Sequence, residues 1–379
     1  MASLRKPRPR ADGSVAHSVL YTHKGQQTSA TFDTAKDAEE FRDAVNTIGA
    51  ERANRAWGVN PTKVAAKRST APTVTDWLTG YIESRTGVSK ATIFDYKSYR
   101  DNDLAPMLGA VPIDVLTAND VAEWVNWMAK RPSGKKDEDG EPLTLSGKTI
   151  ANRHGFLSAA LNIAVKEGLI PSNPAAGTRL PRTARKEMVY LTSDELKVFV
   201  ECFTPHWRPL VKFLASSGAR IGEVAALKPS DVNRAARTVH IGKGRKRTYD
   251  ENRYEVGPTK TKKSDRLITL SAGVLDSIDY TGATLFTNTV GKPIEKDSFR
   301  NNVWYPAVER AQKAGLEKRP RIHDMRHTCA SLMIAGGANM YAVQRHLGHE
   351  SIQTTINLYS HLDRKDAEAA ADIMGKIFD

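Results

Sequence analysis

Across residues 73–177 apolar side chains recur every three to four positions, a spacing that predicts amphipathic helices. The longest helix is expected from Lys148 to Glu167, ending at Gly168. Another is expected to begin at Thr117, which with Asp120 forms a capping-box-like start. We therefore predict an all-α domain of four or five helices. Turn-forming and charged residues at 131–142 predict a solvated loop within it.

Residues 1–60 show a different pattern, with short runs at 15–22 and 27–32 that predict β-strands. A helix is expected from about Thr34, because Ala38, Phe41 and Val45 follow at helical spacing. Three short strands and one helix would form a small α+β domain. The alternative is a basic, flexible tail with a marginal helix. Residues 61–72 lack apolar periodicity and are predicted to be a linker.

After a second basic linker at 178–187, residues 188–379 are predicted to form a mixed α+β domain that is mainly helical. Helices are expected from the Thr192 capping box, over 207–216 and from about 296, and strands over 238–241 and 267–270. Tyr341 lies in an apolar helical pattern and is expected in the core. An apolar stripe along 363–379 predicts a tail helix. The fold class is therefore multidomain.

The charge of the chain favours a polyanionic partner. The 379 residues carry a formal net charge of +13, and lysines and arginines placed on phosphates gain affinity by releasing counterions. Because no run of about 18 apolar residues and no signal-peptide stretch is present, we expect the protein in the host cytosol, away from membranes. Cys202 and Cys329 are far apart in sequence and are expected to be reduced and packed.

Near the C-terminus, several short segments supply cations and one phenol. Arg220, Arg326 and neighbouring histidines can hold the oxygens of a phosphodiester, because guanidinium groups donate paired hydrogen bonds and stay charged. A tyrosine can attack such a phosphate and become a covalent ester. The set therefore indicates a phosphodiester site, with Tyr359 as the candidate nucleophile.

These segments, Ser216-Ser-Gly-Ala-Arg220-Ile-Gly-Glu223, His323-Asp-Met-Arg326-His327, Leu347-Gly-His349 and Tyr359, resemble the boxes of the tyrosine recombinases, particularly lambda-type phage integrases. The resemblance implies catalytic roles for Arg220, Lys260, His323, Arg326, His349 and Tyr359. It implies supporting roles for Glu223 and for His327, which would hold the helix or position Arg326. Lys260 is chosen because Pro258-Thr-Lys260-Thr resembles the family's lysine hairpin, and Lys262 and Lys263 compete for the same role.

The resemblance also implies partners and domain roles. Residues 1–60 would bind arm-type DNA sites, 73–177 core-type sites, and 188–379 would catalyse cleavage and rejoining through a 3′-phosphotyrosine in a homotetramer. No cofactor and no metal is implied, and a DNA-bending host factor and a directionality factor are possible partners. Between Gly242 and Arg266, nine basic residues oppose four acidic ones, so this hairpin is expected at DNA. The DNA-binding candidates are Arg5, Lys6, Arg8, Arg10, Lys243, Arg245, Lys246, Arg247, Lys262 and Lys263.

Other functions remain open from the sequence. His323 and His327 share the spacing of a zinc helix, but Asp324 replaces the glutamate of that motif and Arg326 would repel a cation, which disfavours a metallohydrolase. A non-catalytic, sequence-specific DNA-binding regulator is a second alternative. Within the recombinases, a host-type chromosome resolvase or a transposon recombinase is an alternative to a phage or mobile-element integrase.

Overall fold

The computed structural model describes residues 1–59, 69–136, 140–183, 188–249, 253–259 and 262–359. The chain divides into two compact units, Met1–Arg185 and Lys186–Asp379. The predicted linkers 61–72 and 178–187 lie partly outside the described residues, and the predicted tail helix at 363–379 lies wholly outside them.

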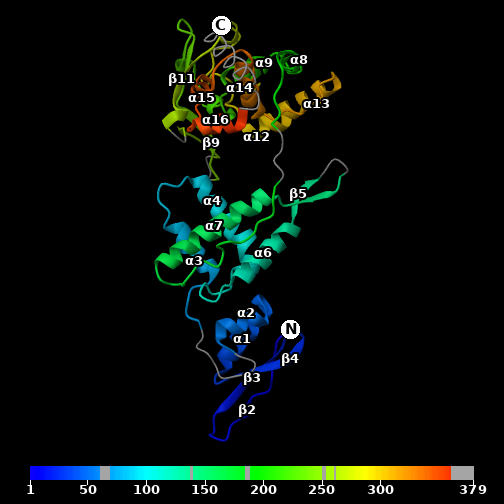
Figure 1. Ribbon diagram of the computed structural model, residues 1–379, viewed down its shortest axis with the longest axis vertical. Coiled ribbons are helices and arrows are strands. Elements are labelled where there is room, and N and C mark those ends of the chain that lie inside the picture. The colour runs from blue at the N-terminus through cyan, green and yellow to red at the C-terminus, as the bar shows by residue number, and fades with distance from the viewer. Residues whose placement is uncertain (60–68, 137–139, 184–187, 250–252, 260–261, 360–379) are drawn as a thin grey trace, which may run out of the picture. The chain divides into compact units, whose positions relative to one another are not determined.

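The first part of unit 1 is a four-stranded antiparallel sheet with two helices packed on it (Figure 1). Strand β3 (Val15–His23) pairs with β4 (Gln26–Phe32) along one edge, and with β1 (Ser3–Leu4) and β2 (Arg8–Pro9) along the other. Phe41 of helix α1 (Ala35–Ile48) is fully buried and packs on Tyr21 and Phe32, with ring centroids 5.3 and 5.0 Å apart. The two longer strands and α1 confirm the sequence prediction.

The expected total of three strands and one helix is wrong. Helix α2 (Ala50–Trp57) follows α1 after Gly49, whose φ of 84° breaks the first helix. Strands β1 and β2 have two residues each and are too short to show an alternating pattern.

The second part of unit 1 is helical, as predicted. Its elements are α3 (Val74–Glu83), α4 (Lys90–Ser98), a π-helical turn η1 (Tyr99–Leu104), α5 (Ala105–Leu108), α6 (Ala118–Lys130) and α7 (Gly147–Lys166). The predicted loop at 131–142 is wrong, because β5 (Pro132–Lys136) pairs with β6 (Pro142–Thr144) in a short hairpin. Its strands are largely exposed and polar, so no apolar alternation marks them.

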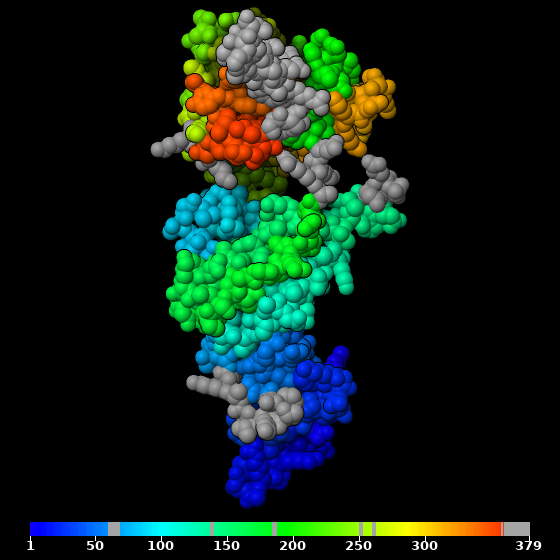
Figure 2. Space-filling view, in the orientation of Figure 1, coloured from blue at the N-terminus to red at the C-terminus, as the bar shows by residue number. Residues whose placement is uncertain are grey.

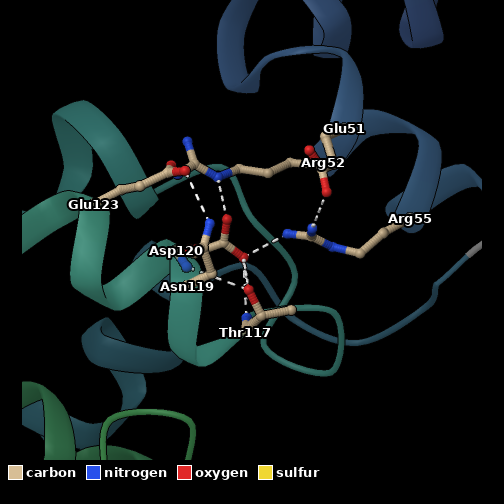
Figure 3. Close-up of polar contacts among 7 residues, drawn as sticks. All are labelled: Glu51, Arg52, Arg55, Thr117, Asn119, Asp120 and Glu123. Carbon is tan, nitrogen blue, oxygen red and sulfur yellow. Dashed lines mark hydrogen bonds and ion pairs between the residues drawn. The ribbon is translucent and has the colours of Figure 1, made fainter. Parts of the chain in front are cut away.

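A cluster of ion pairs joins the two parts of unit 1 (Figure 3). Asp120 at the start of α6 is 3% exposed, and its oxygens accept hydrogen bonds from Arg52 Nε at 2.7 Å and from Arg55 Nη2. Arg52 Nη2 also donates to Glu123 at 2.7 Å. Thr117 and Asp120 form the predicted capping box, so the same carboxylate caps α6 and anchors α2. One hydrophobic cluster also runs through both parts.

Unit 2 places helices around a small sheet and a separate hairpin. The sheet has the order β11-β8-β7, with β8 (Thr238–Ile241) between β11 (Arg266–Thr269) and β7 (Val232–Asn233), and the hairpin pairs β9 (Lys243–Arg247) with β10 (Tyr254–Pro258). Strands β8 and β11 and the basic hairpin confirm the prediction.

The helical elements of unit 2 agree with the expected starts near 192, 207 and 296. They are α8 (Ser193–Glu201), α9 (Arg208–Ser217), α10 (Ile221–Val224), 3-10 turn η2 (Pro229–Asp231), 3-10 turn η3 (Lys262–Ser264), α11 (Ala272–Asp276), α12 (Lys296–Phe299), π-turn η4 (Arg300–Trp304), α13 (Tyr305–Lys313), α14 (Asp324–Ala335), α15 (Met340–Leu347) and α16 (Ile352–Tyr359). Aromatic side chains, including Phe199, Phe203 and Trp304, fill its main core.

Two further predictions concern single residues. Cys329 is buried at 3% exposure and Cys202 is half-buried against the main core of unit 2, so both are packed, as expected. The placement of Tyr341 in the core is wrong, because its side chain is 64% exposed. Among the helices that the structure describes, none combines the length and apolar content that a bilayer crossing requires.

Candidate active site

Arg220 is held at a sharp turn between two helices. Helix α9 ends at Gly218 in the left-handed region (φ 57°), and Arg220 is the extended residue before α10. Glu223 Oε1 accepts from Arg220 Nη1 at 2.7 Å, and its Oε2 accepts from the Arg220 backbone N–H at 3.0 Å. Burial alone would raise the pKa of Glu223, but the charges of Arg266 and Arg220 outweigh it and lower that pKa. Glu223 is therefore an ionised support for Arg220, whose side chain is 44% exposed.

Arg326 lies in the first turn of α14 and is 2% exposed. Its Nη1 donates to the Gly218 carbonyl at 2.8 Å, while its buried Nη2 has no hydrogen-bond partner among the described residues. Burial, with repulsion from Arg220 and Arg266, lowers the pKa of Arg326 to about 10. The guanidinium therefore stays charged at neutral pH and keeps one donor free for a ligand oxygen.

The imidazoles of His323 and His349 are neutral near pH 7. Burial, with repulsion from neighbouring cations, lowers the pKa of His323 to about 4 and that of His349 to about 3. His349 follows Gly348, which ends α15, and its Nδ1 lies 2.9 Å from Thr355 Oγ1. When the Thr355 hydroxyl donates to Nδ1, Nε2 carries the proton and can donate to a ligand.

Tyr359 ends α16 and is 1% exposed, although α16 itself reaches the surface as the orange-red segment in Figure 2. Its hydroxyl lies 2.7 Å from His327 Nδ1. Burial raises the pKa of Tyr359 to about 12 and lowers the pKa of His327 below its ordinary value. Both groups are therefore neutral near pH 7, and the phenol O–H donates to Nδ1 when the imidazole proton lies on Nε2.

This contact gives His327 a place that the sequence interpretation missed. His327 was expected to hold the helix or position Arg326, but its ring touches the candidate nucleophile. The two residues are 32 positions apart. No local pattern relates them, and only the packing of α16 near α14 brings them together.

The basic hairpin packs beside the turn that carries Arg220. A Cβ on Gly222 would lie 2.9 Å from the Arg245 carbonyl, so this glycine allows the close approach of β9. Lys243, Lys246 and Arg247 are exposed on this hairpin, and Arg245 is half-buried. Its charge is thus presented next to the candidate site.

The lysine candidates are described only in part. Lys260 lies outside the described residues, so its expected role is untested. Lys262 belongs to the turn η3, since β10 ends at Pro258. Lys263 Nζ donates to the Glu350 carbonyl at 2.7 Å, which directs it to the segment after His349.

The N-terminal candidates lie in unit 1. Arg5, Lys6, Arg8 and Arg10 are all exposed, and Arg10 pairs with Asp33 at 2.7 Å.

Comparisons with known proteins find similar sequences and a similar fold. Residues 189–366 match the phage integrase family. An integrase of Mycobacterium phage L5 is 25% identical over 368 residues, covering 92% of this chain and 90% of that protein. Tyrosine recombinase XerD of Chlorobaculum tepidum is 27% identical over 269 residues, covering 65% of this chain and 84% of that protein. The Tn1549 transposon integrase, solved in complex with a circular intermediate DNA, has a similar fold, with a TM-score of 0.68, 23% identity and coverage of 80% of this chain and 100% of that one.

Proposed function

We propose that this chain is a tyrosine site-specific recombinase that cuts and rejoins DNA at attachment sites, because its residues 189–366 match the phage integrase family. One observation carries the proposal: Arg326 Nη1 donates to the carbonyl of Gly218, two residues before Arg220, and the next residue of α14, His327, contacts the Tyr359 hydroxyl at 2.7 Å. The free, buried Nη2 of Arg326 supplies a donor for the oxygen of a scissile phosphate.

The cationic groups would stabilise the phosphorus as negative charge develops on it. A phosphodiester carries one negative charge, and the pentavalent transition state carries a second, so fixed donors bind the transition state more strongly than the ground state. Arg220 and Arg326 would hold the non-bridging oxygens. His323 and His349 would act as neutral hydrogen-bond donors, because their lowered pKa values keep them uncharged.

The proposed reaction conserves bonds and needs no nucleotide cofactor. The Tyr359 O–H bond breaks as its oxygen attacks phosphorus, and its proton would pass to His327 Nδ1, 2.7 Å away. The bond between phosphorus and the 5′ oxygen breaks, and this oxygen leaves with a proton that Lys260 would supply. A 3′-phosphotyrosine and a free 5′ hydroxyl result. The 5′ hydroxyl of the partner strand then attacks the phosphotyrosine, and Tyr359 recovers a proton.

The partners follow from this reaction. Exchange between two duplexes cleaves four strands, so we propose a homotetramer on double-stranded DNA. The helical part of unit 1 and the β9–β10 hairpin would contact core-type sites, and residues 1–60 would contact arm-type sites. A phage or mobile-element integrase working on DNA in the host cytosol is favoured by the match to the phage L5 integrase along 92% of this chain. A DNA-bending factor and a directionality factor would be additional partners.

The test is covalent trapping on a nicked suicide duplex chosen from a library of sites. Wild-type protein should form a covalent protein–DNA complex, and Tyr359→Phe should bind the duplex without forming one. Tyr341→Phe is the matched control: Tyr341 is 64% exposed, so this variant should cleave the duplex as the wild type does. If Tyr359→Phe still forms an adduct, another residue is the nucleophile. If the wild-type protein binds the duplex but forms no adduct, the protein is better explained as a non-catalytic DNA-binding regulator.

A further inference from the structure

Arg266 is a buried arginine that the proposed reaction does not use. It begins β11 and is 8% exposed, although an unpaired guanidinium is costly to bury. Each of its three nitrogens has a separate acceptor. Nε donates to the His346 carbonyl at 2.9 Å, Nη1 to the Ser264 carbonyl at 3.0 Å, and Nη2 to Glu223 Oε2 at 3.2 Å.

The contact with Glu223 connects Arg266 to Arg220. Glu223 is 5% exposed and bridges the two guanidiniums, with Arg220 Nη1 at 2.7 Å from its other oxygen. Without Arg266, Glu223 Oε2 would keep only the Arg220 backbone N–H at 3.0 Å. The orientation of Arg220 would then depend on a carboxylate that no group other than Arg220 itself holds.

The contact with the His346 carbonyl also affects the position of His349. The last carbonyls of a helix lack partners within it, and Arg266 Nε takes one of them at the end of α15. Gly348 lies directly against the same side chain, since a Cβ there would approach Arg266 Cδ to 2.8 Å. Arg266 thereby sets where the chain turns into His349. His346 Nε2 also lies 3.0 Å from the Ser216 carbonyl, which ties this turn to the end of α9.

The contact with Ser264 fixes the turn η3, which carries the competing lysines Lys262 and Lys263. Arg266 Nη1 donates to the Ser264 carbonyl, and Lys263 of the same turn donates to the Glu350 carbonyl at 2.7 Å. One guanidinium thus joins η3 to the two stretches of chain that carry Arg220 and His349.

We propose that Arg266 is a positioning residue for DNA cleavage, which sets Arg220 and His349 in place through Glu223 and the end of α15, and which holds the turn η3 to both through Ser264. The inference rests on the proposed recombinase function. A lysine could not replace it, because a single ammonium cannot reach three acceptors that a planar guanidinium meets with separate N–H groups.

The experiment compares Arg266→Lys and Arg266→Met with the wild type as full-length proteins. Single-turnover formation of the covalent complex is measured at saturating protein on the suicide duplex, with the affinity for that duplex measured separately. Rates are scaled to the folded fraction of each variant, found from urea unfolding. Arg345→Met is the matched control, because Arg345 is exposed on the neighbouring helix α15.

We expect Arg266→Lys to bind the duplex within about threefold of the wild type but to cleave it about 100-fold more slowly, since a displacement of about 1 Å in a catalytic group costs this much. The cleavage rate of the double variant Arg266→Lys/Glu223→Gln should fall by less than the product of the two single-variant reductions, because both substitutions act on Arg220. A purely structural role would change the folded fraction and leave the scaled rate unaltered.

The inference is overturned if the scaled cleavage rate of Arg266→Lys lies within about threefold of the wild type, or if its loss appears only in affinity. Failure of the proposed function looks different: the wild type and Arg345→Met would form no covalent complex either. That outcome would overturn both proposals, whereas normal cleavage by Arg266→Lys would overturn only this one.

Discussion

Replacing Asp120 should loosen the connection between the two parts of unit 1. Its carboxylate is 3% exposed and accepts from Arg52, Arg55 and both the N–H and the hydroxyl of Thr117. Asp120→Ala removes all of these acceptors at once. Glu123→Gln is the matched control, because Glu123 pairs with the same Arg52 but its side chain is 54% exposed.

The expected loss of stability depends on which ion pairs Arg52 and Arg55 retain. Breaking a buried ion pair costs about 3–5 kcal/mol, whereas the hydrogen bond from the Asp120 backbone N–H to Thr117 Oγ1, which caps α6, does not use the replaced side chain. Arg52 retains Glu123, and Arg55 retains Glu51 at 3.7 Å, so the lower end applies and we expect about 3 kcal/mol. The exposed control should cost less than about 1 kcal/mol.

Hydrogen exchange read by mass spectrometry on the full-length protein measures this locally. Peptides from α2 and α6 should exchange roughly 150-fold faster in Asp120→Ala, which corresponds to about 3 kcal/mol. Peptides from α9 in unit 2 should be unchanged and serve as the internal reference. If α2 and α6 exchange no faster than in Glu123→Gln, the ion pairs do not hold the two parts together and the reasoning is refuted.

Two further predictions concern unit 2. Gly218→Ala should lower the free energy of unfolding by about 2–5 kcal/mol, because the backbone of Gly218 is left-handed and an added Cβ would lie 2.3 Å from Leu347 Cδ2. The control is Gly315→Ala, where φ is 96° and a Cβ would meet no atom, so the loss in the same urea titration should be only about 1–2 kcal/mol. Equal losses in the two variants would contradict the clash with Leu347. The single-turnover cleavage rate should show no inflection near pH 6.5 from His323 or His349, because their pKa values are lowered to about 4 and about 3 and both stay neutral above that range; an inflection that either His→Gln variant removes would contradict this.

Helix periodicity and capping residues predicted most of the fold. Helix α7 was expected over 148–167 and spans Gly147–Lys166, and the Thr117 and Thr192 capping boxes mark the starts of α6 and α8. Capping residues and helical periodicity involve residues within one or two helical turns of each other, so they can be recognised directly in the sequence. The β5–β6 hairpin was missed because pairing between polar, exposed segments leaves no apolar alternation to detect.

The wrong placement of Tyr341 has a geometric cause. Val343 and Leu347 are fully buried and share one face of α15, at a spacing of four residues. Tyr341 precedes Val343 by two residues, about 200° around the helix, and therefore faces solvent. An apolar segment alone does not decide which of its residues are buried.

Candidate site residues were predictable where a short motif carries them, but their mutual contacts were not. Arg220 with Glu223 follows from a three-residue spacing at a helix start. By contrast, the Arg266 pairing with Glu223 spans 43 positions, and the hydroxyl contact of Tyr359 spans 32. Such contacts depend on how whole elements pack, which local patterns do not specify.

The charge balance around Glu223 bears on how DNA would be used. Glu223 contributes one negative charge against the guanidiniums of Arg220, Arg266 and Arg326, and the resulting repulsion helps lower the pKa of Arg326. A bound phosphate would supply negative charge where that repulsion is felt, and the transition state would supply more. The same groups that repel one another in the free protein would therefore favour the transition state over the ground state. Tyr359, by contrast, is a buried phenol against His327 with its pKa raised to about 12, so it must lose its proton as it attacks.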